Sequence, residues 1–354
     1  MMEINNQAQT GGDNSTQIQG NVINMYGITE QRAREICSEE ARKVLKKCVE
    51  ESEEIARKRV NNFIEEFIPR IRKIEKDLKS FADPAFITLV QKAISTVTCT
   101  ERNEDYENLS ELLAQRVKNK SNIKRTASIT KVVEILYQID DDALCGLTTY
   151  YSVKKFIPTK GSSISDSLSS LNSLLDKIMY MKLPSGYRWI DHLYLLGMIQ
   201  TIPYKQIDKI PDCLIMNFNG YVCIGIRKNS ENHNKASEII KSNDISGNIL
   251  VENEFCKDYV RLNIVNKFSI DNMDINQYQK EALRTIWNMY EQNSSLQKKI
   301  DEKFNEQFSS FQKLSELKSW WNSISPYFIL TSAGEVLAHV NANRCYDKLP
   351  TLDM

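Results

Sequence analysis

Few residues of this chain stand at spacings that could do chemistry. Asp191 and His192 are neighbours, and a carboxylate can orient an imidazole for catalysis. Because adjacent residues on a helix point in different directions, we interpret His192 as a structural, hydrogen-bonded histidine. Three consecutive carboxylates in IDDDALC (Ile139–Cys145) lack the spacing of a calcium loop. Acidic side chains at the start of a helix are stabilised by its dipole, so we predict helix capping there.

Cofactor and metal chemistry has little support in the sequence. The stretch PTKGSS (Pro158–Ser163) contains Lys, Gly and Ser but lacks the order of a phosphate-binding loop, and no G-x-G-x-x-G is present. The eight cysteines form no C-x-x-C pair, and with three histidines a zinc site would need ligands from distant segments. We therefore predict reduced thiols, no cofactor and no metal, and we identify no catalytic residue.

The overall charge does not favour nucleic acid or a membrane surface. Lysine plus arginine equals aspartate plus glutamate at 46 each, so no global field attracts polyanions. Met1 is followed by polar residues, and the longest apolar stretches are far shorter than the roughly 20 residues that cross a bilayer. We expect a cytoplasmic protein without a membrane partner. One locally basic stretch leaves nucleic-acid contact open, through Arg116, Lys118, Lys120, Lys124 and Arg125.

An almost uncharged tract rich in Asn, Gln, Gly and Thr occupies residues 1–28. Between Asn5 and Gly27 its only charged residue is Asp13. Asn and Gln side chains can stack as amide ladders when identical strands of several chains pair in register. We predict a β-prone self-association tract, with a disordered tail as the alternative. The residues expected to stack are Gln17, Ile18, Gln19, Asn21 and Val22.

Two segments show apolar residues three and four apart, which is typical of amphipathic helices. The first predicts a long helix over residues 29–80, with Thr29 as its N-cap and a kink or split at Pro69. A second long helix, from Asp274 to about Trp321, is its predicted partner. We also predict that the first helix associates between copies, along a seam with heptad-like, coiled-coil character. The seam residues are Val44, Cys48 and Ile55.

The remaining segments complete a mainly α fold class: long amphipathic helices and a helical bundle, with a small α+β insert and the short β-prone tract. The predicted ranges are 81–200 for the bundle, 201–270 for the insert, and 271–354 for the second long helix with a C-terminal, wing-like strand and helix.

Within the insert, Asn219 and Gly220 between two apolar runs predict a β-hairpin. Weaker strand candidates are ILVENEF and YVRLNIV, with a short helix before them around Lys235–Lys241. Near the C-terminus, the sequence predicts a strand followed by a helix capped by Thr331.

Several of these stretches resemble known bacterial families. GGDNSTQIQGNVINMYGIT, the charged helix after it and ADPAFITLVQKA resemble an uncharacterised family that opens with a Gly-Asp-Asn-Ser-x-x-Ile-Gln tract before a long helix and a helical bundle. LYLLGMI and FILTSAGEVLAHVNA resemble the C-terminal pattern of abortive-infection alpha-type proteins, whose two elements pack as a wing. The matching residues are Leu195, Leu196, Gly197, Met198 and Ile199 in the first element, and Leu330, Thr331 and Gly334 in the second.

The resemblance implies a bacterial protein of anti-phage defence and supplies no catalytic residues. Together with the tract, it leads to the interpretation of a homo-oligomeric scaffold or sensor that acts by assembly and by binding a phage or host protein. Two alternatives remain. One is a winged-helix-like nucleic-acid binder, and the other is an effector enzyme whose site cannot be identified from spacing.

Overall fold

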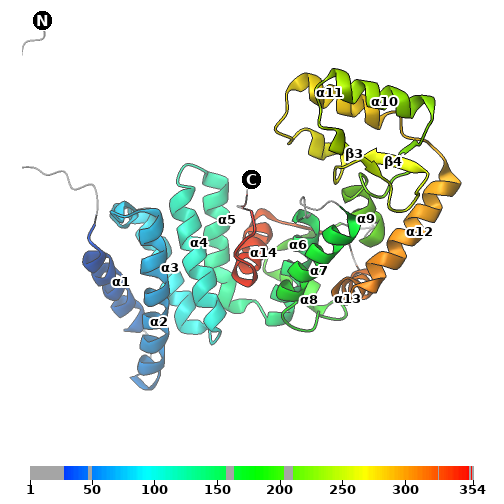
Figure 1. The fold of residues 1–354 in the computed structure, drawn as a ribbon. Helices are drawn as coiled ribbons and strands as arrows, with labels where there is room; N and C mark the ends of the chain where they lie inside the picture. Colours follow the sequence, from blue (N-terminus) through cyan, green and yellow to red (C-terminus); the bar gives the residue numbers. More distant parts are fainter. Residues whose placement is uncertain are drawn as a thin grey trace, which may run out of the picture.

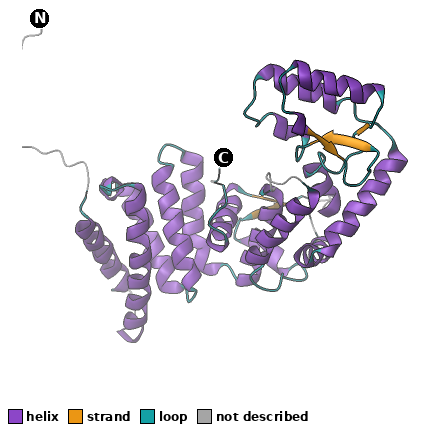
Figure 2. Ribbon diagram, in the orientation of Figure 1, coloured by secondary structure: helices purple, strands orange, loops and turns teal. Residues whose placement is uncertain are grey.

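The computed structural model describes residues 28–46, 50–156, 163–202, 210–325, 327–350 and 352. Within these ranges α-helices dominate, and five short strands form two small antiparallel sheets (Figure 2). The predicted mainly α fold class is therefore confirmed.

The α-helices of the first half are α1 (Glu30–Leu45), α2 (Glu50–Ile74), α3 (Pro84–Cys99), α4 (Asn103–Lys118), α5 (Ile123–Ile135), α6 (Asp141–Lys155) and α7 (Ile164–Ile178). Those of the second half are α8 (Arg188–Leu195), α9 (Ile210–Asn217), α10 (Glu231–Ser242), α11 (Gln277–Trp287), α12 (Ser294–Ser310), α13 (Gln312–Asn322) and α14 (Ser332–Cys345). The strands are β1 (Ile199–Thr201), β2 (Ile226–Arg227), β3 (Leu250–Glu252), β4 (Tyr259–Leu262) and β5 (Phe328–Leu330). Short 3-10 helices lie at Lys79–Ala82 (η1), Leu136–Gln138 (η2), Gly247–Ile249 (η3) and Lys267–Ile270 (η4).

The described elements form a curved body (Figure 1). One end holds α1 and α2, and the other holds α10, α11 and the sheet of β2, β4 and β3. The last helix, α14, lies in the middle, where it packs against α4 and α5 on one side and α6 on the other. Most of its residues from Ala333 to Ala342 are buried, as expected for a helix without a solvated face.

The structure corrects the long helix predicted over residues 29–80. The chain instead forms two antiparallel helices, in which Glu30 at the start of α1 pairs with Arg72 near the end of α2. Arg34 on α1 also pairs with Glu65 on α2 at 3.3 Å. The partner that an amphipathic helix requires is thus the next helix of the same chain, and α3 packs against both.

Of the two local predictions for these helices, the N-cap at Thr29 is present, whereas α2 does not split at Pro69. Thr29 caps α1 as predicted, because its Oγ1 accepts a hydrogen bond from the amide of Arg32 at 3.2 Å. α2, by contrast, continues through Pro69 to Ile74 without a break. Phe67, Ile68 and Ile71 are fully buried on either side of this proline, and their packing offsets the hydrogen bond that proline removes.

The second long helix is also corrected. Residues 277–322 form three helices, with breaks where Asn293 caps α12 and where Phe311 adopts an extended conformation between α12 and α13. α13 packs against α7 and α9. These helices lie away from α1 and α2, toward the other end of the body (Figure 1), so they are not the partner of the first amphipathic segment.

The hairpin predicted at Asn219 and Gly220 is wrong, because the apolar run before it forms the helix α9. A short apolar run does not by itself distinguish a strand from a buried helix. The other strand candidates are confirmed: β3 and β4 pair antiparallel, with Val251 opposite Arg261, and β2 pairs with the other edge of β4. The short helix before them is α10.

All these elements, α11 to α13 included, belong to one excursion of the chain between β1 and β5. An ion pair between a buried arginine and a more exposed glutamate fixes part of this excursion to α7. Arg261 on β4 is almost fully buried, donates to Glu254 Oε1 at 2.9 Å, and lies over the ring of Tyr221. Both oxygens of Glu254 accept from the amide of Ile164, at the start of α7, at 3.2 Å.

Candidate functional site

A wing-like unit occupies the centre of the chain and consists of α6, α7, α8, β1, β5 and α14; we call it the wing unit. β1 and β5 pair antiparallel, with Ile199 opposite Leu330 and Thr201 opposite Phe328. Three helices followed by a two-stranded antiparallel sheet are the topology of a winged helix. Here the excursion of the chain from residue 202 to residue 327 takes the place of the short wing loop.

The two resembling sequence elements meet in the wing unit, although more than a hundred residues separate them. Gly197 ends α8 in the left-handed region, with φ of +73°, and the amide of Met198 donates to the carbonyl of Leu193 at 2.8 Å. This is a common way for a helix to end at a glycine. Thr331 then joins the elements, since its amide donates to Met198 O at 2.9 Å and its hydroxyl donates to Gly197 O at 2.8 Å.

Gly334 makes this junction possible. A Cβ atom at this position would lie 2.0 Å from the carbonyl oxygen of Met198, so only glycine allows the first turn of α14 to approach β1 this closely. The same turn is capped by Thr331, whose Oγ1 accepts from the amide of Gly334 at 3.1 Å. The predicted cap at Thr331 is confirmed.

One face of α8 is exposed and largely apolar. Trp189, Ile190 and Leu193 point inward and are buried. The opposite face carries five residues at helical spacing, which we call the α8 face: Tyr187, Arg188, Asp191, Tyr194 and Leu195. The exposed fractions of the two tyrosines and the leucine are 61%, 58% and 79%. Neighbouring aromatic and aliphatic groups left in water are typical of a contact surface for another molecule.

A hollow of about 780 Å³ lies beside the C-terminal half of the α8 face. Its lining residues are Asp191, Tyr194, Leu195, Gly197, Ile199, Gln200 and Thr331. The hollow therefore combines apolar side chains of α8 with the backbone junction of β1 and α14.

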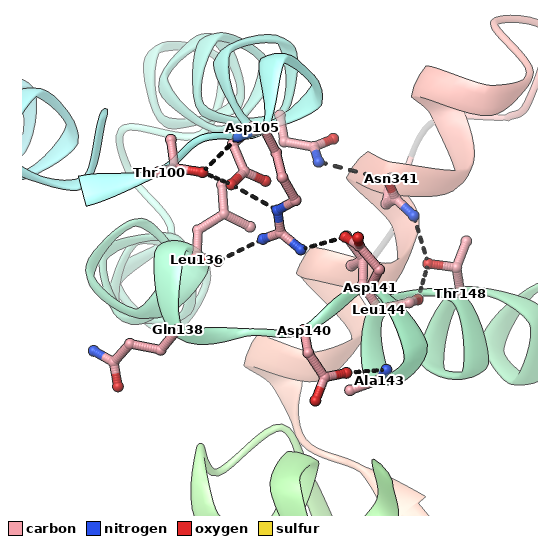
Figure 3. Close-up of polar contacts among 12 residues, drawn as sticks. Thr100, Asp105, Leu136, Gln138, Asp140, Asp141, Ala143, Leu144, Thr148 and Asn341 are labelled. Carbon is pink, nitrogen blue, oxygen red and sulfur yellow. Dashed lines mark hydrogen bonds and ion pairs between the residues drawn. The ribbon is translucent and has the colours of Figure 1, made fainter. Parts of the chain in front are cut away.

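Polar contacts, some of them buried, hold the wing unit to the N-terminal helices (Figure 3). Arg102 donates to Asp105 at 3.0 Å, to the carbonyl of Leu136 at 3.0 Å and to Asp141 at 2.8 Å. Asp105 is fully buried and also accepts from the hydroxyl of Thr100. Burial raises the pKa of Asp105, against the opposing effect of the Arg102 charge. These contacts tie the start of α4 to the start of α6.

A second group of polar contacts lies between α4, α6 and α14. Asn341 on α14 donates to the hydroxyl of Thr148 on α6 at 2.8 Å (Figure 3). Asn108 on α4 donates to Asn341 Oδ1 at 3.5 Å. Because Asn108, Thr148 and Asn341 are fully buried, this group favours one relative placement of the three helices.

The candidate catalytic residues do not form a catalytic pair. The Nε2 atom of His192 lies 3.0 Å from the carbonyl oxygen of Gln138, while Asp191 is on the exposed α8 face. The predicted hydrogen bond of His192 is therefore present. The capping prediction for the three carboxylates is confirmed for Asp140, which accepts from the amide of Ala143 at 2.6 Å, whereas Asp141 binds Arg102 (Figure 3).

A buried tyrosine and histidine pair lies deeper in the wing unit. The hydroxyl of Tyr151 is 3.1 Å from His339 Nδ1, and the amide nitrogen of Asn343 is 2.9 Å from His339 Nε2. Burial, assisted by the Arg125 charge, lowers the pKa of His339 to about 4. The histidine is therefore neutral at neutral pH, and both ring nitrogens are used in structural contacts.

The structure separates the proposed nucleic-acid residues into two groups. Arg116 is buried and lies 3.9 Å from Asp83, and Arg125 is buried and donates to the carbonyl of Leu352. Lys118, Lys120 and Lys124 are exposed around the turn between α4 and α5, and Lys120 pairs with Glu75 at 3.0 Å. Of the five proposed residues, only the three lysines are therefore exposed, and Lys120 among them is already paired.

Only two of the eight proposed oligomerisation residues, Val44 and Ile55, lie within the described ranges. Gln17, Ile18, Gln19, Asn21, Val22 and Cys48 lie outside the described residues. Val44 packs against the core and is half-buried, whereas Ile55 is 56% exposed on α2. The antiparallel α1 and α2 therefore bury part of the predicted seam within one chain.

The described ranges contain neither a cluster of metal ligands nor a membrane-spanning helix. No group of three His, Cys, Asp or Glu side chains in those ranges is arranged to hold a metal ion. None of the helices there is long and apolar enough to cross a membrane.

Residues 27–351 match a protein-family model whose description names no activity. The chain belongs to that family. The match includes every helix and strand of the described structure and leaves out nearly all of the tract at residues 1–28. No curated protein and no solved structure matches the chain.

Sequence reasoning missed the α8 face and the polar contacts of Arg102 and Asn341. The α8 face had a local signal: YRWIDHLYLL carries apolar residues on all sides of a helix, more than one face can bury. The polar contacts had no such signal, because Arg102 and Asp141, or Asn108 and Asn341, meet only after the chain has folded.

We predict that Gly334→Ala lowers the free energy of unfolding by about 1–3 kcal/mol, because the new methyl group must displace the Met198 carbonyl or α14. Urea unfolding followed by circular dichroism measures the change. Gly247→Ala is the matched control, since a Cβ there meets no atom within 4 Å. Equal stability of the Gly334→Ala variant and the wild type would contradict the role of this junction.

We predict a pH dependence from His339. Since its folded pKa is lowered to about 4, between pH 6.5 and 4 the unfolded chain binds a proton that the folded chain does not. The free energy of unfolding should therefore fall as pH decreases, by about 2 kcal/mol between pH 7 and pH 5 from this residue. Urea unfolding at both pH values should show a smaller change for His339→Gln. The same change in both proteins would refute the assignment.

Proposed function

We propose that this protein is a homo-oligomeric scaffold or sensor of bacterial anti-phage defence that acts by assembly and by binding a protein partner. The observation that carries the partner-binding part of the proposal is the α8 face. In helix-turn-helix proteins that bind DNA, the second helix of the motif enters the major groove. In the wing unit the corresponding helix is α8, which presents Tyr187, Tyr194 and Leu195 to solvent.

The charge of the α8 face supports a protein partner over nucleic acid. Arg188 and Asp191 are its only charged residues, so the face carries no net charge. A DNA-binding helix usually needs several cations to neutralise phosphates. An exposed surface with tyrosines and a leucine instead resembles the centre of a protein interface.

Assembly is assigned to a different part of the chain. The tract at residues 1–28 contains the amide-rich and β-capable residues that favour stacking between copies, and nearly all of it lies outside the family match. The role in defence rests on the resemblance to abortive-infection alpha-type proteins. The direct packing of the two resembling elements through Thr331 and Gly334 supports it.

The assembly part predicts that Ile18→Asp converts a defined oligomer of the full chain into monomers or dimers. A buried carboxylate at each repeat of a stack would repel its neighbours. Light scattering after gel filtration measures the mass, and circular dichroism checks that the helices remain. Ala8→Asp adds the same charge to the tract outside the proposed stacking residues and should leave the mass unchanged. An intact oligomer of Ile18→Asp would refute this part.

Nucleic-acid binding is the second candidate because Lys118, Lys120 and Lys124 are exposed together. We expect the wild type and the triple alanine variant to bind DNA and RNA equally weakly, since Arg116 and Arg125 are buried. Fluorescence anisotropy at several salt concentrations tests this. Tight binding by the wild type, with a salt slope about three units smaller in the triple variant, would favour nucleic acid instead.

A further inference from the structure

We infer that the partner of the α8 face is a second copy of this chain, with the two α8 helices antiparallel across a twofold axis. This inference rests on the proposed function and specifies the partner of that same face. It is carried by the charges of the α8 face, by its shape and by the position of the hollow.

The charges of the α8 face are complementary to themselves. Arg188 and Asp191 lie on the same face, three residues apart, and neither forms an ion pair with another residue of the described ranges. In an antiparallel pair, Arg188 of each copy comes close to Asp191 of the other. A twofold axis repeats this contact, so one cation and one anion per chain produce two ion pairs.

The shape of the α8 face also fits a second copy. Tyr187 and Tyr194 are seven residues apart, or about 10 Å along the helix axis. When the axis of symmetry lies midway between them, Tyr187 of one copy lies against Tyr194 of the other. Tyr194 is one of the residues that line the hollow of about 780 Å³, so Tyr187 of the other copy would lie beside it. Each copy thus offers one tyrosine and one hollow, and offset aromatic pairs of this kind stabilise interfaces.

The small size of the α8 face indicates a weak contact between two copies. α8 has only eight residues, and such a surface is well below the roughly 800 Å² per partner of a stable interface. The contact should be weak between separate chains. Once the N-terminal tract gathers several copies, the local concentration rises and the α8 faces pair. The state of assembly is then transmitted to the wing unit.

Charge exchange tests the inference in the full chain. Arg188→Asp and Asp191→Arg should each weaken self-association by about tenfold, because each places like charges opposite one another. The double variant R188D/D191R restores opposite charges and should return to within about threefold of the wild type. Sedimentation equilibrium measures the dissociation constants. Arg42→Asp changes an exposed arginine of α1 and should have no effect.

Rescue by the double variant separates a second copy from any other partner, whose own charges would not change. Failure of the rescue, or single variants that associate like the wild type, would overturn the inference. The same measurements with Ile18→Asp distinguish it from the proposed function. If Ile18→Asp dissociates the oligomer while the α8 variants have no effect, assembly through the tract stands and the α8 pairing is wrong. If instead the α8 variants dissociate the oligomer while Ile18→Asp has no effect, the α8 pairing stands and assembly through the tract is wrong.

Discussion

The structure depends on the close approach of Gly334 to the carbonyl oxygen of Met198. This contact sets the first turn of α14 against β1, and it closes the excursion of the chain that begins after Thr201. From there α14 runs through the middle of the molecule and packs against α4, α5 and α6 (Figure 1). A larger residue at position 334 would change the placement of a helix on which both halves of the described chain rely.

In this chain, polar groups in the interior determine how helices pack together, whereas apolar groups at the surface form the proposed binding face. Arg102 at the start of α4 binds Asp141 on α6, and Asn341 on α14 bonds to Asn108 on α4 and Thr148 on α6. These contacts specify how α4, α6 and α14 fit together rather than adding much net stability. Tyr187, Tyr194 and Leu195 are exposed on a helix held by that framework. Because the residues beneath this apolar face hold it in place, it loses little conformational entropy when a partner binds.

The sequence predicted well those elements that have local signals. Thr331 caps α14, and the candidate strands ILVENEF and YVRLNIV contain β3 and β4. It failed where tertiary packing decides. Residues 46–49, between α1 and α2, contain neither Gly nor Pro, so the helical periodicity continues across the point where the chain turns back. The α8 face could have been predicted from the excess of apolar residues, but the hollow beside it could not, because Thr331 completes its lining from far along the chain.

The central claim is that the α8 face is covered when copies of the chain associate. Hydroxyl-radical footprinting of the full chain at low and high protein concentration tests it at the side chains themselves. The account predicts that modification of Tyr187, Tyr194 and Leu195 falls as the chain associates, while Tyr278, which is 82% exposed on α11, stays equally reactive. Association without protection of the α8 residues would contradict the account.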